Sequence, residues 1–192
     1  KIFKYLHLSD FLALFKMSFF KTYKKGETIA REGEYFEDVF LVRKGIIRTY
    51  VITSEGDQRT IKIAKEKDFT TCAASFIDGK PSTEYLEAIE DCKVISVNRN
   101  KMMSLSQDNI GILKLVLEGY KQAFTEAATR IEFFTILTPE QRYKKTIDES
   151  PDLIQRVPQK YLASYLGITT VSLSRIRKRL IKDADLVRST KT

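Results

Sequence analysis

Residues 157–180, VPQKYLASYLGITTVSLSRIRKRL, constrain the fold most, because their spacing is typical of two short helices joined by a tight turn. Gly167 would form the turn, and Ala163, four residues earlier, would let the two helices cross closely. Pro158 suits a first helical turn, where its missing N–H costs nothing, and Thr169 suits the N-cap of the second helix. The helices would pack through the apolar residues Leu162, Leu166, Ile168, Leu173 and Ile176. The sequence therefore predicts a helix-turn-helix.

The outward side of the second helix carries residues suited to DNA. The N-terminal side chains of a recognition helix reach base edges in the major groove. Arg175 is the best candidate for paired hydrogen bonds to guanine, and Val171 can touch a thymine methyl group. Lysines and arginines that could neutralise phosphates follow, namely Arg177, Lys178, Arg179 and Lys182. Two alternatives stay open: an ordinary helical hairpin with a solvated basic face, and a helix-turn-helix that serves protein contacts.

Positive charge is concentrated in the same part of the chain. From Pro139 onward there are 12 lysines and arginines against 6 acidic residues, whereas the preceding residues hold 21 against 19. A sequence pI near 9.4 fits a polyanionic partner. Membrane-surface binding competes as an explanation, but the basic helix lacks a bulky aromatic insertion face. Because charges also interrupt every apolar stretch, we expect a cytoplasmic protein without a membrane partner.

The first half of the chain has the pattern of an antiparallel β-roll. Between about Ser18 and Val97, short apolar runs alternate with glycine-containing turns; the runs are VFLV, IIRTYVI, RTIKIA, YLEAIE and KVISV. Repeated short strands of this kind are typical of a compact roll or barrel.

A long helix is predicted between the two halves, from about Asn109 to Phe134. Apolar residues recur there in an a/d heptad pattern, at Ile110, Leu113, Leu117, Tyr120, Phe124, Ala127, Ile131 and Phe134. The pattern predicts a homodimer interface, although part of the stripe is also expected to pack on the β-roll. Thr138 and Pro139 then end the helix and mark a hinge.

This order of parts resembles the Crp/Fnr family of bacterial transcription regulators. Residues 25–61, KGETIAREGEYFEDVFLVRKGIIRTYVITSEGDQRTI, look like half of a cyclic-nucleotide-binding roll, and residues 156–180 look like the family's DNA-binding unit. The resemblance implies an α+β chain in three parts. These are a jelly-roll-like, cyclic-nucleotide-binding-like effector domain over residues 1–108, a dimerisation helix and hinge over 109–138, and a winged helix-turn-helix with a shortened wing over 139–192.

The resemblance also implies roles for individual residues. Thr170, Val171 and Arg175 match base-contacting positions, and Gln159, Thr169, Ser172 and Lys178 match positions near phosphates. Val171 stands where well-known members place a carboxylate, so a different preferred operator is expected. The implied partners are double-stranded DNA, a second copy of the chain, RNA polymerase and an unidentified small-molecule effector.

The effector site departs from the family pattern. Members that bind cyclic AMP carry a Glu and, about ten residues later, an Arg that pairs with the cyclic phosphate; here Cys72 and Ser82 stand at those positions. The expected pocket residues are Thr71, Cys72, Ser82 and Thr83. Without the guanidinium, cyclic AMP is not expected to bind unless Arg59 or Lys62 replaces the missing charge. Cys72 is either a thiol sensor or, as favoured here, a small buried side chain.

Catalysis and metal binding are not expected. His7 is the only histidine, and Cys72 and Cys92 are too few for an iron–sulfur cluster or a structural zinc site. No nucleophile–base pair, Walker loop or dinucleotide-binding glycine motif is evident. We therefore predict a non-enzymatic protein that needs no cofactor.

Overall fold

The computed structural model describes residues 7–189, with side chains described up to residue 182. The helices are α1 (Leu8–Met17), α2 (Ala73–Asp78), α3 (Arg99–Asp108), α4 (Ile110–Thr135), α5 (Pro139–Glu149), α6 (Leu153–Arg156), α7 (Gln159–Leu166) and α8 (Thr170–Ser189). The strands are β1 (Ser18–Tyr23), β2 (Thr28–Ala30), β3 (Asp38–Lys44), β4 (Ile47–Ile52), β5 (Gln58–Ala64), β6 (Phe69–Thr70), β7 (Tyr85–Ala88) and β8 (Cys92–Asn98).

The strands form two four-stranded antiparallel sheets, in the orders β1-β8-β3-β6 and β2-β7-β4-β5. Side chains alternate across each strand, so Phe40 and Val42 of β3 enter the core between the sheets while Val39 and Leu41 point the other way. Each of the five apolar runs coincides with a strand. The expected jelly-roll-like β-roll is therefore confirmed.

The turn between β3 and β4 requires a glycine at position 45 for two reasons, its backbone conformation and the lack of space for a side chain. Gly45, between β3 and β4, has a φ of 92°, and a Cβ there would lie 2.6 Å from the carbonyl oxygen of Asp91. The tight approach brings the β3–β4 turn against the residues that lead into β8.

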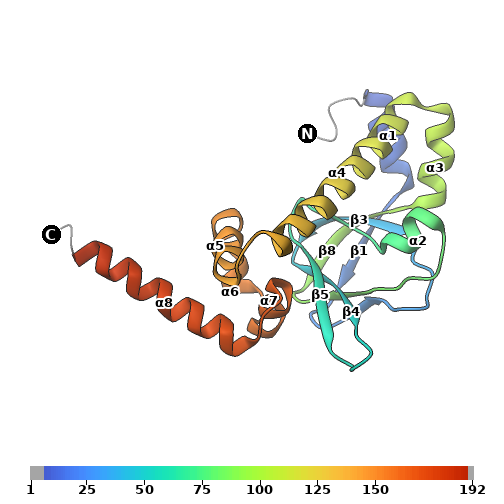
Figure 1. Ribbon diagram of the computed structural model, residues 1–192. Coiled ribbons are helices and arrows are strands. Elements are labelled where there is room, and N and C mark those ends of the chain that lie inside the picture. The colour runs from blue at the N-terminus through green and yellow to red at the C-terminus, as the bar shows by residue number, and fades with distance from the viewer. Residues whose placement is uncertain (1–6, 190–192) are drawn as a thin grey trace.

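Helix α4 runs along one side of the roll and joins it to the C-terminal helices (Figure 1). It begins after Asn109, whose side chain accepts a hydrogen bond from the backbone N–H of Ile112 at 3.0 Å. Its inner face packs Ile112 and Val116 against Phe76 of α2 and Met102 of α3. The predicted long helix is thus confirmed to within a residue at each end.

Residues 99–189 form helices joined by short turns, with no strand among them. Thr138 caps α5 and Pro139 is its first residue, as expected for the break after α4. α8 continues as one helix to Ser189, so the described residues show no wing. In Figure 1, α8 extends away from the rest of the molecule.

Candidate nucleic-acid interface and effector cavity

The turn between α7 and α8 has the geometry that the sequence predicts. Gly167 adopts a left-handed conformation with a φ of 67°, and its N–H and that of Ile168 bond the last carbonyls of α7. A Cβ on Gly167 would lie 2.7 Å from Cε1 of Phe134, so the ring at the end of α4 closes directly over the turn. Both backbone conformation and space therefore demand glycine here.

The two helices pack through the predicted apolar positions. Leu162, Ala163, Leu166, Leu173 and Ile176 are all buried, and Ile168 packs against them. Phe133, Tyr143 and Leu153 complete this core from α4, α5 and α6. The helix-turn-helix is therefore a packed unit with a fixed outer face.

That outer face exposes most of the predicted DNA-contacting side chains. Gln159, Thr169, Thr170, Val171, Arg175 and Lys178 are exposed, and Ser172 is half-buried. The Thr169 hydroxyl accepts a hydrogen bond from the Ser172 N–H at 3.1 Å, which confirms Thr169 as the cap of α8. Arg175 and Lys178 make no hydrogen bond or ion pair with any described residue. Two cations on the leading part of α8 thus remain available for a ligand.

Two of the expected phosphate cations are instead engaged inside the domain. Arg177 donates to the hydroxyl of Tyr143 at 3.2 Å, and Arg179 pairs with Glu140. Tyr143 and Glu140 both lie on α5, so Arg177 and Arg179 face that helix. The expectation that Arg177 and Arg179 serve DNA phosphates is not supported by these contacts.

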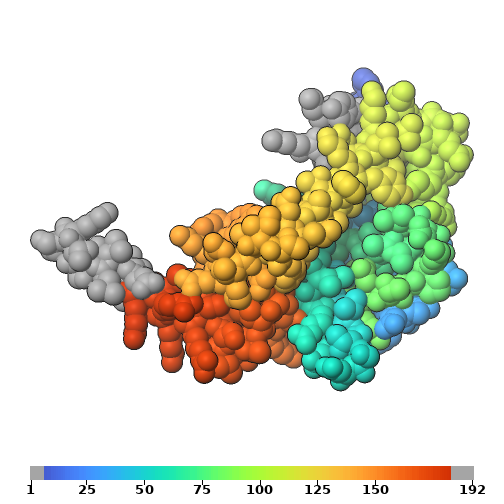
Figure 2. All heavy atoms as spheres, in the orientation of Figure 1, coloured from blue at the N-terminus to red at the C-terminus, as the bar shows by residue number. Residues whose placement is uncertain are grey.

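The helix-turn-helix is docked against the β4–β5 hairpin (Figure 2). Arg48 of β4 is only 1% exposed, and its guanidinium carbon lies 3.6 Å from the ring centre of Tyr161 on α7 and 4.0 Å from that of Tyr50. It donates to Glu87 at 2.6 Å and to Gln58 at 2.7 Å. Tyr161 also donates to Glu87, at 3.2 Å, so one buried cation joins the roll to α7.

A second polar contact lies at the edge of the same interface. Arg156, the last residue of α6, forms ion pairs with Glu66 at 2.8 Å and Glu90 at 2.7 Å, both in the roll. The hydrogen bond from Arg156 lowers the pKa of Glu66 to about 2, and the hydrogen bond from Lys65 lowers the pKa of Asp152. The orientation of the helix-turn-helix relative to the roll is therefore held by charge as well as by packing.

The outer face of α4 leaves the predicted heptad stripe uncovered. The a positions Ile110, Leu117, Phe124 and Ile131 are exposed, Leu117 by 56% and Phe124 by 77%. Among the d positions, Leu113, Ala127 and Phe134 are also exposed, whereas Tyr120 is half-buried beside Phe76. Most of the stripe therefore does not pack on the chain's own roll, which is the arrangement expected of a surface that pairs with another helix.

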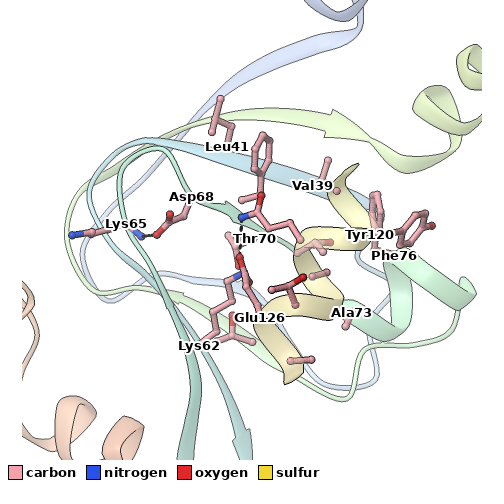
Figure 3. Close-up of a pocket in the computed structure, with 18 of the residues that line it drawn as sticks. Val39, Leu41, Lys62, Lys65, Asp68, Thr70, Ala73, Phe76, Tyr120 and Glu126 are labelled. Atoms are coloured by element: carbon pink, nitrogen blue, oxygen red, sulfur yellow. Dashed lines mark hydrogen bonds and ion pairs between the residues drawn. The ribbon is translucent and has the colours of Figure 1, made fainter. Parts of the chain in front are cut away.

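A large open cavity, about 1350 Å³ in volume, lies between the roll and α4 (Figure 3). Its apolar wall includes Leu41, Phe69 and Phe76, and its polar wall includes Thr49, Thr70, Lys62, Asp68 and Glu84. Lys62 forms an ion pair with Glu126 of α4 at 2.6 Å. Arg59 instead pairs with Asp57 on the exposed β4–β5 turn. Of the two residues considered as substitutes for the missing arginine, only Lys62 lines the cavity.

Only one of the four expected pocket residues, Thr71, lines this cavity. The Ser82 hydroxyl is used locally: it donates to the carbonyl of Glu84 at 2.8 Å and accepts from its N–H at 3.0 Å. Thr83 is exposed, and Cys72 is fully buried, with burial raising the pKa of its thiol to about 11. Cys72 thus has the surroundings of a small core side chain, not of a reactive thiol.

Thr49 and Glu84 line the cavity although the family motif does not predict them, because the fold brings them there. Thr49 lies directly across from Lys62 in the β4–β5 ladder, and Glu84 accepts a hydrogen bond from the N–H of Ala73 at 3.2 Å. Their common location depends on strand register and on the packing of α2, and no local sequence signal marks it.

Among the described residues, there is no group of three or more His, Cys, Asp or Glu side chains that could hold a metal ion. Within residues 7–189, none of the helices combines the length and hydropathy needed to cross a bilayer.

Comparison with known proteins finds one family model and two relatives that are similar to parts of the chain. Residues 20–109 match the model of the cyclic nucleotide-binding domain. The Fumarate and nitrate reduction regulatory protein of Salmonella typhi is 23% identical over 176 residues, covering 86% of this chain and 70% of that protein. The Transcriptional activator protein FnrA of Stutzerimonas stutzeri is 47% identical over 36 residues, which are 19% of this chain and 15% of that protein.

Solved structures extend the likeness over most of the chain. FixK2 from Bradyrhizobium japonicum has a TM-score of 0.76 at 19% identity, covering 87% of this chain and 86% of that chain. The c-di-GMP responsive global regulator CLP of Xanthomonas campestris has a TM-score of 0.72 at 15% identity, covering 93% of each chain. Residues 20–109 are therefore similar to the cyclic nucleotide-binding domain, and the chain shares its fold with FixK2 and CLP.

Proposed function

We propose that this protein is a homodimeric, sequence-specific DNA-binding transcription regulator of the Crp/Fnr type. The observation that carries the proposal is the leading face of α8, where Arg175 and Lys178 are exposed and form no ion pair with a described residue, on a packed helix-turn-helix. The two relatives, a transcriptional activator protein and a regulatory protein, agree with this function. Residues 1–108 act as the effector domain, 109–138 as the dimerisation helix and hinge, and 139–192 as the DNA-binding domain.

Base reading and phosphate binding are assigned to different residues of the same face. Thr170, Val171 and Arg175 contact bases, while Gln159, Thr169, Ser172 and Lys178 lie near phosphates. The Thr169 hydroxyl caps α8, so its contribution to DNA is secondary to its structural role. Arg175 has the planar donor pair that recognises the O6 and N7 of guanine.

Dimerisation follows from the outer face of α4. An exposed heptad stripe of this length is typical of helices that pair in a coiled coil. Two copies would present two recognition helices, which is how most helix-turn-helix proteins address paired half-sites.

The effector cavity is not built for cyclic AMP. The cyclic phosphate is an anion, yet the cavity presents the carboxylates of Asp68, Glu84 and Glu126 around Lys62, which is already paired with Glu126. Lys62 is paired with Glu126, and Arg130 donates to the carbonyl of Tyr165, so neither cation is free to compensate for desolvating the phosphate. Titration calorimetry with cyclic AMP should therefore show no binding at micromolar concentrations.

The alternative is an interaction module whose helix-turn-helix binds protein, and a salt titration of DNA binding separates the two. A DNA-binding function predicts that affinity falls steeply and linearly on a logarithmic salt scale. Arg175→Ala should cost about 1–3 kcal/mol and relax preference at one base position, whereas Lys178→Ala should weaken all sequences alike and reduce the salt slope by about 1. Equal losses for Arg175→Ala on specific and random DNA would remove its base-reading role.

A further inference from the structure

The cavity between the roll and α4 contains two buried hydroxyl groups without partners. Thr49 and Thr70 are 3% and 2% exposed, both line the cavity, and neither side-chain oxygen has a hydrogen-bond partner among the described residues. Buried polar groups in native proteins are nearly always hydrogen-bonded, because an unsatisfied group keeps its full desolvation penalty. These two hydroxyls are therefore placed to bind a ligand group.

The charges beside these hydroxyls are predominantly negative. Lys62, the cross-strand neighbour of Thr49, pairs with Glu126 (Figure 3), and its charge also acts on the carboxyl groups of Asp68 and Glu84. Only Glu126 forms an ion pair with it. Asp68 and Glu84 each accept one backbone N–H, from Lys65 and Ala73, and burial raises the pKa of both carboxyl groups. Three carboxylates thus share one ammonium group.

The remaining cations of the cavity wall are committed elsewhere or lie apart. Lys65 pairs with Asp152, and in Figure 3 its side chain points away from the other labelled residues. Lys121 and Lys145 pair with Glu118 and Glu149. Arg130 donates to the carbonyl of Tyr165 and stacks on its ring, while Arg43 is exposed. Asp68 and Glu84 therefore form no ion pair with any described residue of the cavity wall.

We propose that this end of the cavity binds an organic cation, a primary amine carried on an aromatic or apolar body. The ammonium group would donate to the hydroxyls of Thr49 and Thr70 and pair with Glu84, whose carboxylate accepts the N–H of Ala73 and forms no ion pair with a described residue. The apolar body would pack against Phe76 and Tyr120, whose rings lie 6.4 Å apart on α2 and α4. This assignment rests on the proposed role of residues 1–108 as an effector domain, since such a ligand would bridge the roll and the dimerisation helix.

Calorimetry on the full chain at pH 7 tests the ligand class with two matched probes. Tyramine carries the ammonium group, and 3-(4-hydroxyphenyl)propionate carries a carboxylate on the same phenol skeleton. We expect tyramine to bind with one site per chain and the acid to bind at least tenfold more weakly. Absence of tyramine binding, or equal binding of the two probes, would overturn the proposal.

Substitutions locate the bound probe. Glu84→Gln should weaken tyramine binding by about 10- to 150-fold, the range of one charge-assisted hydrogen bond, and Thr49→Val with Thr70→Val should weaken it further. Glu55→Gln, on the exposed β4–β5 turn, is the matched control and should leave binding unchanged. An unchanged affinity in Glu84→Gln, with the fold verified by circular dichroism, would refute the site. DNA binding of the ligand-free protein is measured separately, so its loss would count against the proposed function and not against the amine site.

Discussion

Replacing Arg48 by methionine should destabilise the protein strongly, although Arg48 lies in the roll and is not part of the proposed DNA-binding face. The guanidinium is 1% exposed, and its partner Glu87 has a side chain only 15% exposed. Removing one member of a buried ion pair costs about 3–5 kcal/mol, because the other charge stays buried without compensation. The stacking on Tyr50 and Tyr161 is lost as well, and each desolvated cation–π contact contributes up to about 2 kcal/mol. The expected loss is therefore at least about 3 kcal/mol.

Urea denaturation followed by far-ultraviolet circular dichroism measures this change, since the chain has no tryptophan for fluorescence. Arg59→Met is the matched control, because Arg59 is 54% exposed and forms only a surface pair with Asp57. It should lose at most about 1 kcal/mol. Combining Arg48→Met with Glu87→Leu removes both charges and should recover part of the loss. If Arg48→Met is no less stable than Arg59→Met, the buried cation does not hold the helix-turn-helix on the roll.

Three further predictions follow from individual contacts. Gly167→Ala should lower the melting temperature, because a left-handed backbone costs an alanine about 1–2 kcal/mol and the added methyl group meets the ring over the turn; an unchanged melt would contradict this. Replacing Leu117 and Phe124 together by aspartate should give monomers in analytical ultracentrifugation, since unpaired charge would enter the heptad stripe; a full dimer would exclude that stripe as the interface. The pKa of Glu66 is about 2 in the folded chain, below its usual 4.5, so its contribution to stability is present above pH 4.5 and is lost as the pH falls toward 2. The difference in urea midpoint between the native protein and Arg156→Gln should therefore shrink over that range, and a constant difference would rule out this linkage.

The parts of the fold that follow from local patterns could be predicted from the sequence. Five apolar runs are five strands, and the heptad positions of α4 identify its exposed face correctly because helical periodicity determines both faces at once. β2 and β6, with three and two residues, are too short to show any alternation. They are held by their neighbours in the sheets and could not be predicted from local pattern.

The site depends on contacts between residues distant in sequence, and this limited what could be predicted. Arg48 lies within the apolar run IIRTYVI, and nothing near it indicates that Tyr161 of α7 will cover it. The family pattern predicts a pocket at Cys72 and Ser82, yet the cavity wall includes Thr49 and Glu84 and neither of those two residues. Arg177 and Arg179 were predicted to bind phosphates because they are basic. Their contacts with Tyr143 and Glu140 of α5 depend on how α8 packs, which the sequence does not indicate.

Selection of bound sequences from random duplex DNA is the most direct test of the central claim that the chain is a dimeric, sequence-specific DNA-binding protein. The proposal predicts enrichment of two inverted half-sites whose centres lie about one helical turn, 10–10.5 base pairs, or a multiple of it apart. Arg175→Ala, carried through the same selection, should lose preference at one position in each half-site. Recovery of sequences no different from the input pool would contradict the proposed function.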